Sequence, residues 1–232
     1  MVRLPLSYLT FEVQHPAPPV AAPPCVANGY LTFGSLVAQY KITPPVLDAW
    51  AELLRRTGRT RLVLANAALQ SIHNRAYVRD QFVQRGVDGE RVILEGPAAH
   101  FEYLQKHDRL DVALDAFPYN GGTTTMEAIW QGVPVLTLDG DRWAARTSQS
   151  ILRRTHLSEF VAQDVRGYVE QAVAVARDPT APARLSHLRR AIRWQLRGSS
   201  AWDTPALARA MEATYERCVL EGERCPTRQV TT

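Results

Sequence analysis

The sequence predicts an α/β fold, a doubly wound parallel sheet with helices on both faces. Short apolar runs alternate along the chain with segments of helical pattern, and the loops between them are short. This alternation is typical of a parallel sheet whose strands are covered on both faces. The 232 residues are 46% hydrophobic and 22% charged, which indicates a globular chain long enough for one large domain.

Five apolar runs are expected as strands, and residues that stop regular structure bound several of them. Gly34 closes the first run, Pro97 follows the third, and the fourth leads directly into a glycine turn. The expected strands span residues 30–34, 61–65, 91–96, 110–114 and 134–138.

Helical patterns lie between these runs and after the last of them. Thr43 is the expected N-cap of the first helix, with Pro44 at the first helical position. No further strand is expected after the fifth. The expected helices span residues 44–54, 74–84, 98–107, 123–131, 142–154, 164–177, 181–197 and 204–220.

The amino-terminal region differs in composition from the rest. Residues 15–24 are half proline, which predicts a stiff extended connector and excludes a helix or a central strand. The folded body is expected to start at Tyr30, and the tail from Gly222 is expected to fray. An apolar start precedes the connector, with Leu4, Leu6, Tyr8, Leu9 and Phe11.

The glycine turn after the fourth strand carries the main functional signal. Gly121 and Gly122 allow a tight turn and the close approach of a bulky group. Thr123, Thr124 and Thr125 place amides and hydroxyls at a helix N-terminus, where the dipole favours an anion. This pattern predicts a phosphate site, although an ordinary turn with a threonine cap would use the same residues.

Two charged residues belong to the same hypothesis. Glu127 lies in the first turn of the helix, where a carboxylate can accept hydrogen bonds from two ribose hydroxyls. Lys41 lies in the loop after the first strand, at the sheet edge where doubly wound folds bind ligands. Lysine is a compact point charge that suits a diphosphate. The alternative for Lys41 is an ordinary surface lysine before a helix.

The formal net charge of +4 comes mostly from arginines that are interleaved with acidic residues. One concentration of arginines lies on a single expected helix. We interpret it as a solvated helix face, because no aromatic residues are interleaved with it at the spacing of a nucleic-acid site. Its members are Arg184, Arg189, Arg190, Arg193 and Arg197.

Composition also limits the compartment and the cofactors. No apolar run approaches the ~20 residues that span a bilayer, and the N-terminus has no signal pattern. Cys25, Cys218 and Cys225 are scattered and odd in number, which suggests reduced thiols and no zinc site. We therefore expect a cytoplasmic protein with no membrane or nucleic-acid partner.

Several motifs together resemble a known family. Tyr40-Lys41-Ile42-Thr43-Pro44 is similar to the signature Tyr-Lys-Ile-x-Pro, and the stretch from Leu110 to Thr125 is also similar to that family. Trp130 to Thr137 and Asp141-Arg142 continue the match. These residues resemble the C-terminal catalytic half of glycosyltransferase family 41, which holds the O-linked N-acetylglucosamine transferases and the SPINDLY-type proteins.

The resemblance implies the C-terminal, Rossmann-like lobe of a two-lobed GT-B fold, which binds the nucleotide sugar. Lys41 would neutralise the diphosphate and assist its departure, while Thr123 and Thr124 would hold the phosphates. Glu127 stands where the family has an acid that binds the ribose, and Ala98 would offer backbone hydrogen bonds to the base. No metal or other cofactor is expected, because the lysine and the helix N-terminus supply the positive charge.

The chain departs from the family pattern at two positions. Tyr103 falls where the family usually has a histidine against the uracil ring, although a tyrosine can still stack there. Ala38 falls where many members have a polar residue near the phosphates. His100 lies near the loop on the sugar side.

The resemblance further implies a division of the chain. Residues 1–29 would be a remnant of the linker between lobes, 30–220 the nucleotide-sugar-binding lobe and 221–232 a tail. Family enzymes carry an acceptor-binding lobe, and usually tetratricopeptide repeats, before this region. The apolar start would therefore have lost its packing surface.

The function implied is the donor-binding half of an inverting protein O-glycosyltransferase. Its partners would be a nucleotide sugar, an acceptor protein with Ser or Thr hydroxyls, and a separate N-terminal lobe. The alternative is a non-catalytic module, derived from such an enzyme, that binds a nucleotide sugar or another protein. The choice of N-acetylglucosamine, fucose or glucose as the sugar stays open.

Overall fold

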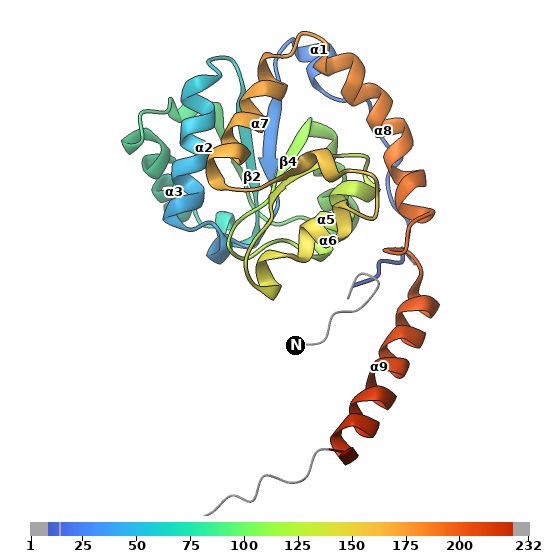
Figure 1. Cartoon of the computed structure of the whole chain (residues 1–232). Coiled ribbons are helices and arrows are strands. Elements are labelled where there is room, and N and C mark those ends of the chain that lie inside the picture. The colour runs from blue at the N-terminus through green and yellow to red at the C-terminus, as the bar shows by residue number, and fades with distance from the viewer. Residues whose placement is uncertain (1–8, 14, 225–232) are drawn as a thin grey trace, which may run out of the picture.

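The structure is a computed structural model that describes residues 9–13 and 15–224. Its centre is one parallel sheet (Figure 1), which confirms the predicted fold class. The strand order is β3-β2-β1-β4-β5-β6. The strands are β1 (Thr32–Ser35), β2 (Arg61–Ala65), β3 (Val92–Glu95), β4 (Val112–Leu114), β5 (Val135–Leu138) and β6 (Val161–Ala162).

Helices connect the strands and follow the last of them. The α-helices of the described residues are α1 (Cys25–Asn28), α2 (Pro44–Arg56), α3 (Ile72–Gln84), α4 (His100–Gln105), α5 (Thr123–Trp130), α6 (Thr147–Leu152), α7 (Val165–Arg177), α8 (Ala181–Arg197) and α9 (Thr204–Arg224).

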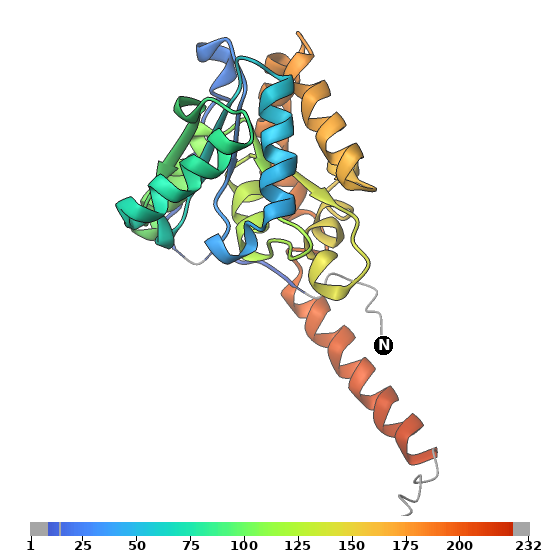
Figure 2. The same ribbon diagram turned by 90° about the vertical axis from the view of Figure 1, so that its left-hand side faces the viewer.

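The helices form layers on both faces of the sheet, as Figures 1 and 2 show. On one face α2, α3 and α7 bury a core around Trp50, Phe82 and Val173. On the other face α5, α6 and α8 bury a second core around Met126 and Ile192. The central strands β1 and β4 are buried along their whole length because both of their faces are covered.

The order of the strands changes direction between β1 and β4. From β1 the chain builds outward through β2 and β3, then returns to the other side of β1 and continues through β4, β5 and β6. Phe33 and Gly34 of β1 are in register with Val112 and Ala113 of β4. The loops that follow β1 and β4 therefore leave the sheet side by side, at the switch point where such sheets bind ligands.

Two expectations for the region after β5 are wrong. A sixth strand, β6, pairs with β5 through Val161 and Ala162, and two residues are too few to give a strand pattern in the sequence. The single helix expected over 142–154 is a 3₁₀ turn at Trp143–Ala145 followed by the shorter α6. The chain bends there because the Asn120 amide donates to the Ala144 carbonyl, which ties this turn to the glycine turn.

The amino-terminal segment packs on the sheet layers. Phe11 lies edge-on to Trp130 and Trp202, with ring centroids 6.5 and 6.0 Å away, and Leu9 packs against the same core. The expectation of a lost packing surface is therefore wrong for Leu9 and Phe11, while Leu4, Leu6 and Tyr8 lie outside the described residues.

The expected connector also ends in ordered structure. Cys25, the first residue of α1, is only 3% exposed. Buried Asp111 accepts hydrogen bonds from the backbone amides of Cys25 and Thr32, which fastens α1 to the start of β1. The division into a linker, a lobe and a tail stays a prediction, although this part of the linker packs against the lobe.

The arginines of α8 are only partly a solvated face, which corrects that interpretation. Arg189 is 1% exposed and donates to the carbonyls of Ala21, His107 and Leu110. Arg193 donates to the carbonyls of Trp130 and Pro18. These two side chains hold the extended amino-terminal segment along α8, while α9 extends away from the sheet layers in both views (Figures 1 and 2).

Candidate functional site

A pocket of about 360 Å³ lies at the switch point, where the loops after β1, β4 and β5 meet. The first contributes Ala38, Tyr40 and Lys41, and the third contributes Trp143. The glycine turn and the start of α5 add Tyr119, Asn120, Gly121, Gly122, Thr123 and Thr124, and the remaining lining residues are Leu9, Val37 and Thr147. The structure thus brings together Lys41, both glycines and two threonines that the sequence selected.

Lys41 joins the loop after β1 to the glycine turn. It ends a 3₁₀ turn at Gln39–Lys41, and its Nζ donates to the Asn120 carbonyl at 2.7 Å. The same nitrogen lies 3.9 Å from the centroid of the Tyr119 ring, which attracts a cation through its π face. Burial lowers the pKa of Lys41 from its usual value, and the negative charge of Asp115 opposes this effect.

Asp115 connects the glycine turn to strand β5 through hydrogen bonds, and the sequence analysis gave this residue no role. Asp115 Oδ1 accepts from the Gly121 amide at 2.7 Å, and Oδ2 accepts from the Thr137 hydroxyl at 2.7 Å. Burial raises the pKa of Asp115, while these bonds and Lys41 act in the opposite direction. The sequence did contain a signal for Asp115, because this residue directly follows a buried apolar run. A parallel strand ends there, at the edge of the sheet where ligands bind.

The N-terminus of α5 faces this pocket. Gly122 precedes the helix without a side-chain cap, so the amides of the first turn have no side-chain acceptor there. The Thr125 hydroxyl does not belong to the pocket, because it lies 2.7 Å from Ser148 Oγ in the interior. Of the three threonines expected at the phosphate site, Thr123 and Thr124 line the pocket, whereas the expectation for the Thr125 hydroxyl is wrong.

Glu127 lies one helical turn further along α5 and is 7% exposed. Its Oε1 is 3.1 Å from Nε2 of His100, the first residue of α4. The Tyr103 ring stacks on His100 at a centroid distance of 6.1 Å. Burial is the main cause that raises the pKa of Tyr103, and the negative charge of Glu127 adds to it. Ala98 lies in the loop between β3 and α4. Glu127, Tyr103 and Ala98 thus lie around His100 and do not line the 360 Å³ pocket.

The histidine in this group was noted in the sequence but given no role. His100 also meets His15 of the amino-terminal segment, with ring centroids 4.4 Å apart. The two groups are connected by α5, because Thr123 and Glu127 are four residues apart, about 6 Å along a helix.

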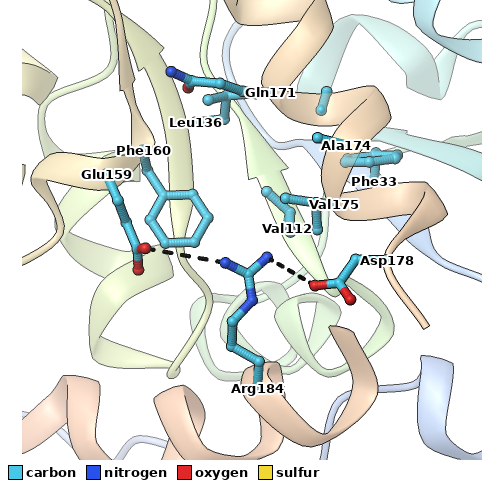
Figure 3. A pocket seen from close by; sticks show the side chains of 11 residues that line it. Phe33, Val112, Leu136, Glu159, Phe160, Gln171, Ala174, Val175, Asp178 and Arg184 are labelled. Atoms are coloured by element: carbon cyan, nitrogen blue, oxygen red, sulfur yellow. Dashed lines mark ion pairs between the residues drawn. The ribbon is translucent and has the colours of Figure 1, made fainter. Parts of the chain in front are cut away.

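A second pocket of about 370 Å³ lies near the amino ends of β1, β4 and β5 (Figure 3). Arg184 reaches across it from α8 and forms ion pairs with Asp178 and Glu159 at 3.7 and 4.0 Å. The other walls are mostly apolar, and none of the predicted site residues lines this pocket.

Within the described residues, no group of three or more His, Cys, Asp or Glu side chains is arranged to hold a metal ion. None of the helices in that part of the chain combines the length and the apolar character needed to cross a bilayer.

A comparison with family models matches residues 26–211 to the model described as glycosyl transferase family 41. The chain belongs to glycosyltransferase family 41. All of the predicted site residues fall inside the matched range, and the six-stranded sheet is that of the C-terminal lobe of a GT-B glycosyltransferase.

Curated relatives in the family are considerably longer than this chain. The SPINDLY protein of Arabidopsis thaliana, named a probable UDP-N-acetylglucosamine–peptide N-acetylglucosaminyltransferase, is 34% identical over 216 residues. The match covers 93% of this chain and 23% of that protein. The enzyme of Caenorhabditis elegans named UDP-N-acetylglucosamine–peptide N-acetylglucosaminyltransferase is 32% identical over 161 residues, which are 69% of this chain and 13% of the relative.

Solved structures agree with the family assignment. A mutant O-GlcNAc transferase of Thermobaculum terrenum superposes with a TM-score of 0.77 at 32% identity, over 93% of this chain and 40% of that one. Sucrose-phosphate synthase of Thermosynechococcus elongatus superposes with a TM-score of 0.59 at 16% identity, over 88% of this chain and 50% of that one. The second likeness shows the shared fold alone.

Proposed function

We propose that this chain is the donor-binding half of a protein O-glycosyltransferase of family 41. It would bind UDP-N-acetylglucosamine or a related nucleotide sugar, and a separate N-terminal lobe would help to present a Ser or Thr hydroxyl of an acceptor protein. The observation that carries the proposal is the 2.7 Å hydrogen bond from Lys41 Nζ to the Asn120 carbonyl. This bond places a cation beside a glycine turn and a helix N-terminus at the switch point of the sheet.

The proposed reaction follows from the charges of this pocket. The acceptor oxygen forms a bond to the anomeric carbon of the sugar, while the bond from that carbon to the diphosphate breaks. The O–H bond of the acceptor also breaks, and its proton would pass to a base outside this chain. The leaving diphosphate gains negative charge, which Lys41 and the amides of Thr123 and Thr124 would stabilise. These groups supply the positive charge locally, so we propose transfer without a metal ion.

The nucleoside end of the donor would lie along α4 and α5. Glu127 would accept from the ribose hydroxyls after exchanging its contact with His100 for the ligand. The backbone near Ala98 would bind the base, and Tyr103 would contribute an aromatic wall. The alternative, a module that binds a nucleotide sugar without catalysis, would use the same contacts and differ only in the absence of transfer.

Calorimetric titration with UDP and with GDP tests the donor site. We expect Lys41→Ala to weaken UDP binding about 10- to 100-fold, the effect of losing a hydrogen bond to a charged group. Arg166→Ala removes an exposed cation of α7 that does not line the pocket, and it should leave binding unchanged. Equal loss of binding in both variants, or none in Lys41→Ala, would contradict the proposal.

A further inference from the structure

A groove of about 640 Å³ runs along α8, between this helix and the proline-rich segment at residues 19–23. It shares no lining residue with the pocket at the switch point. Four of the five arginines that were expected to form a solvated face line this groove, namely Arg189, Arg190, Arg193 and Arg197. Arg184 instead lines the pocket of Figure 3. The proposed transferase function uses none of them.

The inner wall of the groove is fixed in place. Arg189 and Arg193 donate to backbone carbonyls of the amino-terminal segment, at Ala21 and Pro18 respectively. The Arg193 guanidinium also lies 4.6 Å from the centroid of the Trp130 ring, which stacks on Trp202 at 4.8 Å. These two arginines are therefore occupied by the fold, and the groove keeps its shape without a ligand.

The outer rim has a different character. Trp194 is 70% exposed, and Arg190 and Arg197 lie four residues before it and three after it on the same helix. This spacing places the ring between the two arginines on one face of α8. The Arg197 guanidinium lies 5.3 Å from the centroid of the Trp194 ring. Among the described residues, neither Arg190 nor Arg197 forms an ion pair with a carboxylate.

Trp194 is therefore an aromatic residue interleaved with the arginines, and the expectation that there is none is wrong. The rim presents a large exposed indole between two cations whose charges no carboxylate of the described chain neutralises. Such a surface is complementary to a ligand that carries two negative charges with an apolar group between them.

We propose that this groove binds an extended acidic segment of a partner protein. Arg190 and Arg197 are seven residues apart on a helix, which separates them by about 10 Å. An extended peptide advances about 3.3 Å per residue, so acidic residues three positions apart span the same distance. The segment recognised is therefore Asp or Glu, two intervening residues and Asp or Glu again, with an apolar or proline side chain against Trp194.

The geometry favours a peptide over a nucleic acid. Single strands bind to platforms on which successive bases stack, but Trp194 is the exposed aromatic ring of this groove, because Trp130 is covered by Trp202 and Arg193. The opposite wall contains Pro19 and Pro23, which have no backbone N–H to pair with an added strand. Recognition therefore depends on the side chains of Arg190, Trp194 and Arg197.

Fluorescence anisotropy with two labelled peptides tests this inference on the full chain. Both contain two Glu, one Pro and one Leu between glycines; in the first the acids are three positions apart, and in the second they are adjacent. We expect the first peptide to bind at least tenfold more tightly and to weaken as salt is added. Trp194→Ala, and Arg190→Gln combined with Arg197→Gln, should each reduce its affinity at least fivefold.

Matched variants on another part of the surface provide the controls. Tyr77→Ala removes an exposed ring of α3 and Arg166→Gln an exposed cation of α7, and both should leave peptide binding unchanged. UDP binding should be the same in all of these variants, which separates this inference from the proposed function. Equal affinity for the two peptides, no binding of either, or insensitivity to Trp194→Ala would overturn the inference. Tighter binding of an oligothymidylate, lost in the same variants, would assign the groove to nucleic acid instead.

Discussion

A side chain at Gly121 would collide with the start of α5. An ideal Cβ there would lie 2.5 Å from Thr124 Oγ1 and 2.6 Å from Thr125 Oγ1, distances that real Cβ contacts do not reach. We expect Gly121→Ala to shift the turn, to destabilise the chain by about 1–3 kcal/mol and to abolish UDP binding. Gly58→Ala is the control, since a Cβ at that position meets nothing within 4 Å. Urea unfolding and calorimetry measure both effects, and an unchanged affinity for UDP would mean that the turn does not shape the donor site.

His107 is a residue whose protonation opposes folding. It is buried beside Arg189 with Nδ1 3.0 Å from the Leu104 carbonyl, and burial lowers its pKa from 6.5 to about 4. Between these values the unfolded chain binds a proton that the native histidine does not, so stability decreases as the pH falls. The loss from this group reaches about 3 kcal/mol near pH 4.

The contribution of His107 is measured as a difference, because burial also raises the pKa values of the Asp111 and Asp115 carboxyls, which add a pH dependence of their own. Urea unfolding between pH 7 and 4 should show a shallower loss of stability in His107→Gln than in the wild type. His187→Gln, at an exposed position of α8, should follow the wild type. Parallel curves for all three proteins would refute the role given to His107.

At the scale of elements, Arg189 connects three parts of the fold. From α8 it donates to the carbonyls of Ala21 in the amino-terminal segment and of His107 and Leu110 before β4. Arg189→Met removes this donor from all three carbonyls, of which His107 keeps only the Leu110 amide, and leaves buried Asp111 without a nearby cation, so we expect a loss of at least ~3 kcal/mol. Arg190→Met, at the exposed neighbouring position, should cost less than ~0.5 kcal/mol in the same urea titration. Equal losses would show that the buried contacts of Arg189 do not hold these elements together.

The same elements explain which features the sequence could predict. The strands from β1 to β5 could be predicted because buried parallel strands are mostly apolar runs in the sequence. The turn at Gly121 could be predicted because few residues other than glycine leave room for so tight a turn. The strand β6 was missed because two residues carry no pattern. The burial of Arg189 and the role of Asp115 depend on partners far away in the chain, and a single sequence does not show which distant carbonyls or amides surround a charged side chain.

At the scale of the whole molecule, the proposed donor pocket is bordered by loops, by the N-termini of α5 and α6 and by Leu9 of the amino-terminal segment. In the proposed function, Lys41, the glycine turn and α5 would contact the diphosphate, and the group around His100 would contact the nucleoside. The proposal gives no described residue of the pocket the role of orienting an acceptor hydroxyl. Transfer requires that this oxygen be held about 3–3.5 Å from the anomeric carbon, a constraint that the proposal assigns to another lobe.

The last prediction therefore concerns the chain as a unit. The 232-residue chain alone should bind UDP weakly and transfer little or no sugar to an acceptor peptide, because positioning of the acceptor contributes several orders of magnitude to such a rate. Addition of a separately produced N-terminal lobe of a family 41 relative should raise transfer, measured with a radiolabelled nucleotide sugar. Lys41→Ala should abolish this gain, and EDTA should leave it intact if Lys41 and α5 balance the diphosphate charge.

Full transfer by the chain alone would refute the division of labour between lobes, and inhibition by EDTA would show that a metal ion takes part. UDP binding without transfer under any of these conditions would favour the non-catalytic module.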